Sequence, residues 1–141
     1  MKISDEIRSN RIEIEVLDEE DGYVPSFEIG VRIKTKSFDC YLLGFWIEKE
    51  QIQRFIAELQ HLDETRKGSA TLGSMSPNGF ALELKAIDSW GHLGVGIRLE
   101  KDTRSMVGYP DVVQTGFEVD PSSIPYLIKE IKNWKREDYG L

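Results

Sequence analysis

Two stretches of this chain repeat one pattern at a constant spacing of 72 residues. GFWIEKEQIQRFIAEL begins at Gly44, GFEVDPSSIPYLIKEI begins at Gly116, and the two align without a gap. Glycine, phenylalanine, two isoleucines and a glutamate recur in place, and most other apolar positions match in kind. Each stretch has the pattern of a strand that leads into an amphipathic helix. We therefore expect a fold with two similar halves.

Apolar residues alternate with polar ones in several further segments, which predicts strands. The predicted strands are 11–17, 26–35, 38–47, 69–75, 80–86, 92–100 and 112–119. Apolar stripes at i, i+3, i+4, i+7 and i+10 begin at Ile52 and at Ile124, which predicts two helices. We expect the first helix to stop at Gly68 and the second to be capped by Ser122 or Ser123.

Strands joined by short turns, with only two helices, predict an α+β fold of order βββα-ββββα. In it, two amphipathic helices pack on an antiparallel β-sheet. We expect a single domain over 1–141, built from approximate repeats at 11–67 and 69–136. The strand at 38–47 is apolar on both faces, so we expect it at the centre of the sheet. Residues 18–22, DEEDG, are expected to form a turn.

Charge and cysteine content disfavour several classes of function. The chain has 25 acidic and 18 basic side chains and a net charge of −7, which argues against nucleic-acid binding. Residues 1–70 carry −5 of this charge and residues 71–141 carry −2. The one cysteine, Cys40, leaves no internal disulfide and no cysteine-based zinc cluster, and we expect it to be an inert core thiol.

The start of the chain, MKISDEIRSN, is mostly polar and does not resemble a signal peptide. No apolar stretch approaches the roughly 18–20 residues that a membrane span requires. We therefore expect a cytoplasmic protein that does not bind membranes.

Catalytic patterns are missing from the sequence. His61 and His92 show neither a metal-binding spacing nor a paired carboxylate, so we expect a structural role for each. The glycines of GHLGVG (91–96) lie inside an alternating strand, whereas a phosphate loop lies between a strand and a helix. No G-x-S-x-G motif occurs. We predict no catalytic, cofactor-binding or metal-binding residue, no cofactor, and a protein that is not an enzyme.

Two features are typical of recognition. A run of acidic side chains continues from the first strand into the predicted turn and would offer a negative edge to a basic partner, unless it is only a solvated hairpin tip. The tryptophan of the DSWG turn is a candidate interface anchor, unless its ring folds back on the strands. The candidate partner-binding residues are Glu13, Glu15, Asp18, Glu19, Glu20, Asp21 and Trp90.

Three motifs carry a family resemblance. They are A-x-L-x-S at Ala70, D-x-x-G-H at Asp88 and D-x-S-x-I/L at Asp120, within a similar stretch from Phe38 to Trp134. The chain resembles the WapI-type bacterial immunity proteins and their uncharacterised relatives. The resemblance implies a protein that binds and occludes a contact-dependent toxin, often a nuclease, inside the producing cell. It implies no metal or cofactor.

The leading hypothesis is therefore a cytoplasmic binding protein that neutralises a toxin, whose basic surface an acidic inhibitor would attract. The first alternative is a structural or assembly protein that associates with itself through a sheet edge or an apolar face. The second is an enzyme or small ligand-binding domain, which requires a deep cleft with convergent polar groups. Both a monomer and a homodimer are compatible with the sequence.

Overall fold

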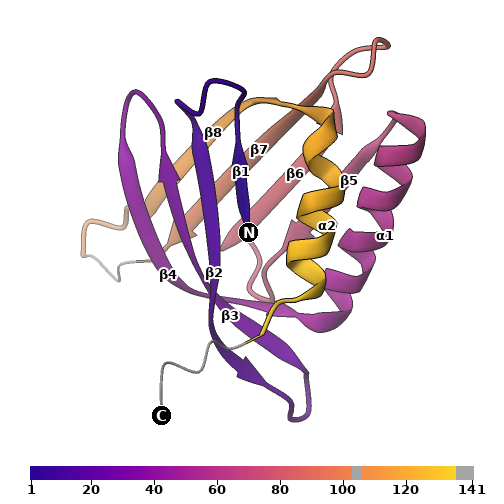
Figure 1. Cartoon of the computed structure of the whole chain (residues 1–141). Helices are drawn as coiled ribbons and strands as arrows, with labels where there is room; N and C mark the ends of the chain where they lie inside the picture. The colour runs from indigo at the N-terminus through magenta and orange to yellow at the C-terminus, as the bar shows by residue number, and fades with distance from the viewer. Residues whose placement is uncertain (103–105, 136–141) are drawn as a thin grey trace, which may run out of the picture.

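The strands divide into two four-stranded antiparallel sheets, one from each half of the chain (Figure 1). The computed structural model describes residues 1–102 and 106–135. Sheet A has the order β1-β2-β3-β4 and sheet B the order β5-β6-β7-β8. The strands are β1 (Lys2–Ser4), β2 (Arg11–Glu20), β3 (Ser26–Lys34), β4 (Asp39–Glu48), β5 (Ser69–Gly73), β6 (Phe80–Ala86), β7 (Leu93–Lys101) and β8 (Asp111–Val119). The helices are α1 (Lys49–Thr65) and α2 (Ile124–Lys132), and a 3-10 turn, η1 (Pro121–Ser123), precedes α2.

The predicted α+β fold with two similar halves is confirmed. The short strand β1 stands before the predicted order, so each half reads ββββα. The second predicted repeat, 69–136, contains residues 103–105 and 136, which lie outside the described residues.

The apolar faces of both sheets contribute to one core, and the two helices lie side by side along one margin of the pair of sheets (Figure 1). Alternation places Ile12 and Ile14 of β2 inside, and in β3 it continues with Ile29, Val31 and Ile33 at 0% exposure. The buried side chains of both halves form one hydrophobic cluster. The predicted helical stripes point into it, with Ile52, Phe55, Leu59 and Leu62 buried in α1 and Ile124, Leu127 and Ile131 buried in α2.

Each helix covers the outer strand of the sheet formed by the other half. Helix α1 follows sheet A but packs chiefly on β5 of sheet B, where Glu58 Oε1 accepts a hydrogen bond from the Thr71 backbone N–H at 3.1 Å. Helix α2 follows sheet B, and Glu130 Oε2 accepts a hydrogen bond from the Lys2 backbone N–H in β1 at 3.1 Å. Glu58 and Glu130 are the glutamate that recurs at the 72-residue spacing. Its repetition therefore has a structural cause, since each copy satisfies an edge donor.

The position predicted for the third strand was wrong, because β4 lies at the edge of sheet A. The outer face of β4 is apolar, as the sequence suggested, but no other element in the described residues covers it, and Tyr41 is 47% and Leu43 49% exposed. A register shift opposite Gly30 gives β4 a bulge at Gly44, whose φ of 84° favours glycine. Cys40 is half-buried and packs against the core, and this burial raises the pKa of its thiol.

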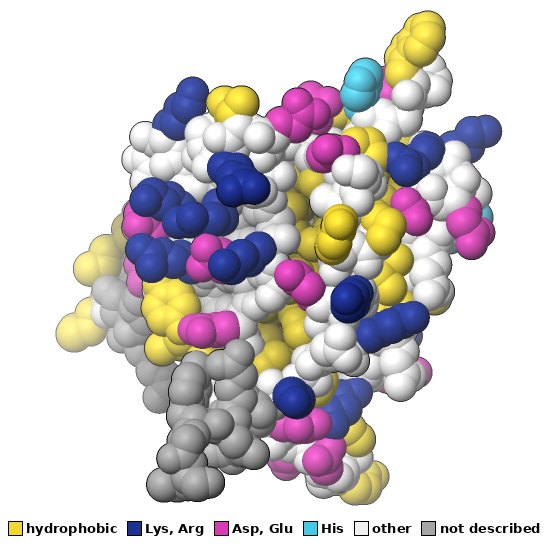
Figure 2. Space-filling view, viewed as in Figure 1, with side chains coloured by type: hydrophobic (Ala, Val, Ile, Leu, Met, Phe, Trp, Pro, Cys, Tyr) yellow, Lys and Arg dark blue, Asp and Glu magenta, His cyan; other side chains and the backbone are white. Residues whose placement is uncertain are grey.

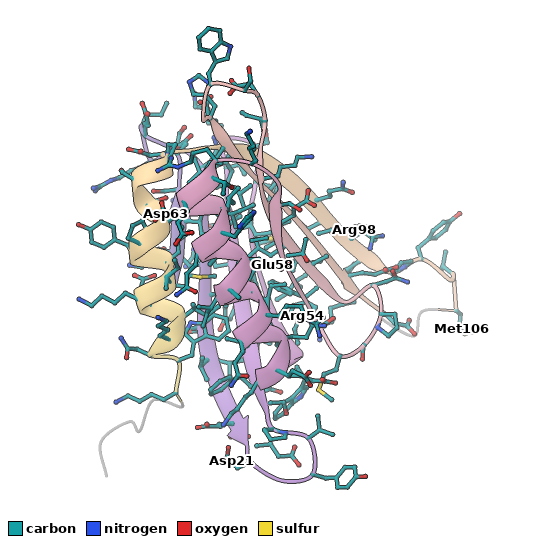
Figure 3. All side chains as sticks on the ribbon, turned by 90° about the vertical axis from the view of Figure 1, so that its right-hand side faces the viewer. Asp21, Arg54, Glu58, Asp63, Arg98 and Met106 are labelled. Carbon is teal, nitrogen blue, oxygen red and sulfur yellow. The ribbon has the colours of Figure 1, made fainter. Side chains whose placement is uncertain are left out.

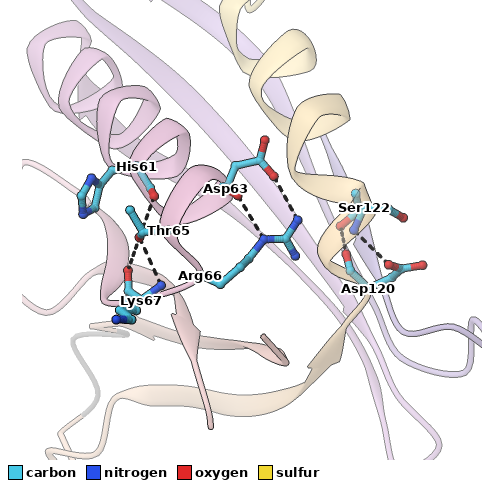
Figure 4. Close-up of polar contacts among 8 residues, drawn as sticks. His61, Asp63, Thr65, Arg66, Lys67, Asp120 and Ser122 are labelled. Carbon is cyan, nitrogen blue, oxygen red and sulfur yellow. Dashed lines mark hydrogen bonds and ion pairs between the residues drawn. The ribbon is translucent and has the colours of Figure 1, made fainter. Parts of the chain in front are cut away.

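The end of α1 differs from the prediction, whereas the start of α2 agrees with it (Figure 4). Helix α1 stops at Arg66, which adopts the left-handed conformation in place of Gly68 and donates its N–H to the Leu62 carbonyl. Helix α2 has Ser123 as its N-cap residue, as predicted, while the Asp120 carboxylate caps the preceding turn η1 by accepting the Ser122 N–H at 2.9 Å. Asp120 thereby explains the D-x-S spacing of the third motif.

The predicted turn at 18–22 was also wrong. Strand β2 runs on to Glu20, with a bulge between Val16 and Asp18, and the chain turns at 21–25. Acidic residues are poor strand formers, so the local sequence suggested a turn where pairing with β3 imposes a strand.

Candidate partner-binding surfaces

Segments at one end of the molecule carry most of the chain's net negative charge. We define the acidic end as residues 18–28 and 48–50, which form the β2–β3 hairpin and the start of α1. These segments contain the seven carboxylates of Asp18, Glu19, Glu20, Asp21, Glu28, Glu48 and Glu50, and their one basic residue is Lys49. They carry −6 (7 − 1) of the chain's −7, so the remaining sequence is close to neutral. Figure 2 shows acidic side chains around the hairpin at the bottom of the molecule.

Strand register brings like charges together at the acidic end. Asp18 on β2 lies directly opposite Glu28 on β3. Glu20 and Glu48 lie in one row on either side of the buried Ser26. Facing residues of antiparallel strands have Cβ atoms about 4.5–5.5 Å apart, where like charges destabilise the sheet. Strand pairing therefore keeps these carboxylates close together despite their mutual repulsion.

Lys49 ties the hairpin to the first turn of α1. Its ammonium donates hydrogen bonds to Asp21 Oδ1 and Glu19 Oε1, both at 2.5 Å, and lies 4.9 Å from the centroid of the Phe27 ring. The carboxylates of Asp21 and then Glu19 raise the pKa of Lys49 through these bonds. The ion pairs fix the relative position of the two segments that carry the acidic groups. Figure 3 places Asp21 at the lower end of the molecule, below Arg54, Glu58 and Asp63 of α1.

An exposed aromatic side chain lies at the tip of the same hairpin. Tyr23 is 102% exposed, and with Val24, Glu48 and Glu50 it lines an open depression of about 720 Å³. An exposed aromatic ring with charged groups around it is typical of the contact residues of protein interfaces. The acidic end thus combines a charged rim with an apolar contact.

The sequence reasoning found only part of this surface. It missed Glu28, Glu48 and Glu50 because they are remote from residues 18–21 along the chain, and only strand pairing brings them together. Tyr23 could have been found, because it follows Gly22 at the centre of the turn-forming sequence DGYVP.

Glu13 and Glu15 lie apart from the acidic end, on the outer face of sheet A. Glu13 forms an ion pair with Arg11 at 3.1 Å, and the hydroxyl of Tyr41 donates to Glu15 Oε1. Basic side chains surround them, and Figure 2 shows these over sheet A. Both carboxylates therefore interact with side chains of their own sheet, Glu13 with Arg11 and Glu15 with Tyr41.

Trp90 lies in the β6–β7 turn at the opposite end of the molecule from the β2–β3 hairpin (Figure 1). The tryptophan is 83% exposed, so its ring is not folded back on the strands. Asp88 holds the turn: its Oδ1 accepts the backbone N–H groups of Trp90 at 2.8 Å and His92 at 3.2 Å. The neighbouring Ile87 is 49% exposed.

The prediction that His92 has no paired carboxylate was wrong, because its Nδ1 lies 2.5 Å from Asp88 Oδ2. The hydrogen bond with Asp88, followed by the charge of that carboxylate, raises the pKa of His92. The bond from His92 correspondingly lowers the pKa of Asp88. Both groups lie at the surface and serve the geometry of the D-x-x-G-H turn.

The two exposed aromatic turns are equivalent in the two halves. Strands β3 and β7 have nine residues each, and both follow the turn between the second and third strands of their half. Tyr23 and Trp90 each stand three residues before these strands. The halves therefore share the position of an exposed ring but differ in the charge around it.

The region beside the N-terminus has the shape of a shallow pocket, of about 490 Å³, between Met1, Val16, Tyr41 and Trp134. Three of its charged lining groups already pair with other residues: Glu13 with Arg11, Glu15 with Tyr41, and Arg32 with Asp39 through two hydrogen bonds. Among residues 1–102 and 106–135, no group of three or more His, Cys, Asp or Glu could hold a metal ion. None of the helices described is long and apolar enough to cross a membrane.

Comparison with known proteins identifies the family. The model of the WapI-like immunity protein family matches residues 3–135, which include both helices, sheet B and all of sheet A except Lys2. No curated protein and no solved structure matches the chain. The match covers both aromatic turns and the acidic end, and the chain belongs to the WapI-like immunity protein family.

Proposed function

We propose that this protein is a bacterial immunity protein that neutralises a cognate toxin in the cytoplasm by binding it, without catalysis. Membership of the immunity protein family supports a toxin as the partner. The acidic end is the observation that carries the choice of surface, because it concentrates −6 of the chain's charge on two adjoining segments. The proposed partner surface is basic.

The mechanism is occlusion by a stoichiometric complex. A concentrated negative potential accelerates encounter with a basic partner by factors of about 10 to 10³ at low salt. Binding would also relieve the repulsion between Asp18 and Glu28, which the free protein retains. Tyr23 then supplies apolar contact area at the centre of the charged rim.

The remaining candidates have smaller or separate roles in this proposal. Glu13 and Glu15 contribute little, because Arg11 and Tyr41 already engage them. Trp90 is a second contact candidate, which we assign to a separate surface because the β6–β7 turn lies at the opposite end of the molecule from the β2–β3 hairpin.

The test uses the full chain and the toxin domain encoded beside its gene. The double variant Glu20→Gln with Glu48→Gln removes two exposed or half-exposed charges from the acidic end. We expect its association rate with the toxin to fall about tenfold at low salt, and the difference to shrink as salt rises from about 50 to 500 mM. Stopped-flow or surface-based kinetics would measure both rates.

The matched control is Glu6→Gln with Glu64→Gln, which changes the net charge equally at two exposed positions outside the acidic end. We expect less than about a twofold change in its association rate. An equal loss in both double variants would contradict a localised site. Loss of binding in Trp90→Ala, with normal binding by the acidic-end variant, would show that the interface lies at the β6–β7 turn instead.

Absence of a complex, together with absence of protection in cells that express the toxin, would reject the proposed function itself.

A further inference from the structure

Three of the four outer strands of the two sheets have their backbone groups covered or interrupted. Strand β1 donates to Glu130 of α2, and β5 donates to Glu58 of α1. Strand β4 is bulged at Gly44, whose carbonyl accepts the Lys101 ammonium at 3.0 Å. Further along β4, the Trp46 carbonyl accepts the Met75 N–H at 2.8 Å. Such devices prevent strands of other molecules from adding to an edge.

Strand β8 has none of these devices in the part of the chain that the structure describes. Within the described residues, its backbone pairs with β7, and no other hydrogen bond to residues 111–119 is present. The strand is nine residues long and contains no lysine, arginine or proline. Its inward-facing Val113, Thr115 and Phe117 are only half-buried, whereas the corresponding side chains of β7 are buried. Long, regular edges of this kind readily accept another strand.

We propose that the open edge of β8 binds β8 of a second copy of this chain, antiparallel and centred on Thr115. Pairing about a two-fold axis at Thr115 sets each residue i opposite residue 230 − i. Val113 of each copy then faces Phe117 of the other, so the apolar contact forms twice.

The charges of β8 favour this self-pairing. Asp111 faces Val119, and Glu118 faces Val112, so no two like charges are opposed across the new interface. The two sheets B become one eight-stranded sheet. The acidic end comes from β2, β3 and α1, so none of its residues takes part in the pairing.

Sedimentation of the full chain, without any toxin, tests the dimer. We expect a reversible monomer–dimer equilibrium with a dissociation constant in the micromolar range, since a single strand pair is a small interface. Thr115→Lys sets two lysines face to face on the axis and should weaken the dimer at least about tenfold, as should Thr115→Glu. An equimolar mixture of these two variants should restore a dimer, because lysine then faces glutamate.

Thr71→Lys is the matched control, because Thr71 lies exposed on the covered edge strand of the same sheet. It should leave the dimer unchanged. A wild-type chain that remains monomeric to about 500 μM would overturn the proposal, as would a dimer that both charges at Thr115 leave intact.

The variant Thr115→Cys is nearly isosteric with the wild type, so it tests the same pairing without the risk that a charged side chain prevents folding. In a Cys40→Ala background, Thr115→Cys should form an intermolecular disulfide under mild oxidation, whereas Thr71→Cys should not. Equal cross-linking of the two would contradict the register. A monomeric chain whose toxin binding is lost in Thr115→Lys would show that the edge receives a foreign strand instead. Since the dimer tests contain no toxin, they succeed or fail independently of the proposed function.

Discussion

At the scale of single residues, the clearest unfavourable arrangement of charge lies at the acidic end. Asp18 and Glu28 face each other across two strands, where like charges destabilise a sheet. Glu50 differs from them, because a carboxylate in the first turn of α1 is favourable to the helix dipole. Glu28 is therefore the residue that best separates a recognition role from a structural one.

Glu28→Gln should stabilise the free protein. Removing one member of the facing pair relieves repulsion, so we expect the free energy of unfolding to rise by about 0.2–1 kcal/mol at low salt. Urea unfolding at two salt concentrations would measure this, and the gain should diminish at high salt because ions screen the pair. A loss of stability would mean that Glu28 has a favourable role in the sheet.

The β6–β7 turn should respond to pH through one ion pair. The pKa of His92 is raised above its ordinary value of 6.5, so its contribution is complete below that pH and disappears as the pH rises through the higher folded value. The pKa of Asp88 is lowered from 3.8, so its contribution is present above that pH and is lost as the pH falls through the lower folded value. The pair is therefore strongest between pH 3.8 and 6.5.

Asp88→Asn tests this assignment directly. The amide oxygen can still accept the Trp90 and His92 N–H groups, but the charge is gone. We expect the pKa of His92, measured from its ring proton shifts by NMR, to decrease toward 6.5. An unchanged His92 titration would show that the pair does not form in solution.

At the scale of elements, the repeated glutamates explain how two of the four outer strands, β1 and β5, have an edge N–H group satisfied by a helix. Sequence reasoning identified the repeat as a strand that leads into an amphipathic helix, but it gave the recurring glutamate no role. The function of Glu58 and Glu130 depends on which strand each helix covers, and no local pattern carries that information. The edge position of β4 was missed for the same reason, since Tyr41 and Leu43 resemble core residues in sequence.

The two hydrogen bonds from helix glutamates to edge strands, Glu58 to Thr71 and Glu130 to Lys2, should be independent of each other. Glu58→Ala should increase amide hydrogen exchange at Thr71, and Glu130→Ala should increase it at Lys2, because each variant removes one acceptor. Each change should cost less than about 1 kcal/mol, since these carboxylates are partly solvated. Faster exchange at both strands in either single variant would indicate a general loosening and not a local bond.

At the scale of the whole molecule, the two halves share one hydrophobic cluster. Alternation and helical stripes predicted most of that cluster, because burial depends on periods that are visible in sequence. The division into two sheets and the exchange of helices depend on contacts between distant segments, so periodicity could not reveal them. Periodicity could not reveal the acidic end either, because Glu48 and Glu50 reach it only through the pairing of β3 with β4.

Leu59→Ala should destabilise both halves together. Leu59 is completely buried on α1, and the cavity should reduce the free energy of unfolding by about 2–5 kcal/mol. Hydrogen exchange in denaturant should show sheets A and B losing protection at the same lowered midpoint. The control Gln60→Ala, at an exposed position, should change stability by less than about 0.5 kcal/mol. Separate midpoints for the two sheets would indicate two independent folding units.

The equivalence of the Tyr23 and Trp90 turns has a consequence for how such a protein diversifies. Both loops protrude from the ends of a framework whose helices lock each half to the other, so their sequences can change without altering the buried cluster. The fold therefore provides two exposed loops, at opposite ends of the molecule, whose sequences are not tied to the packing of the core.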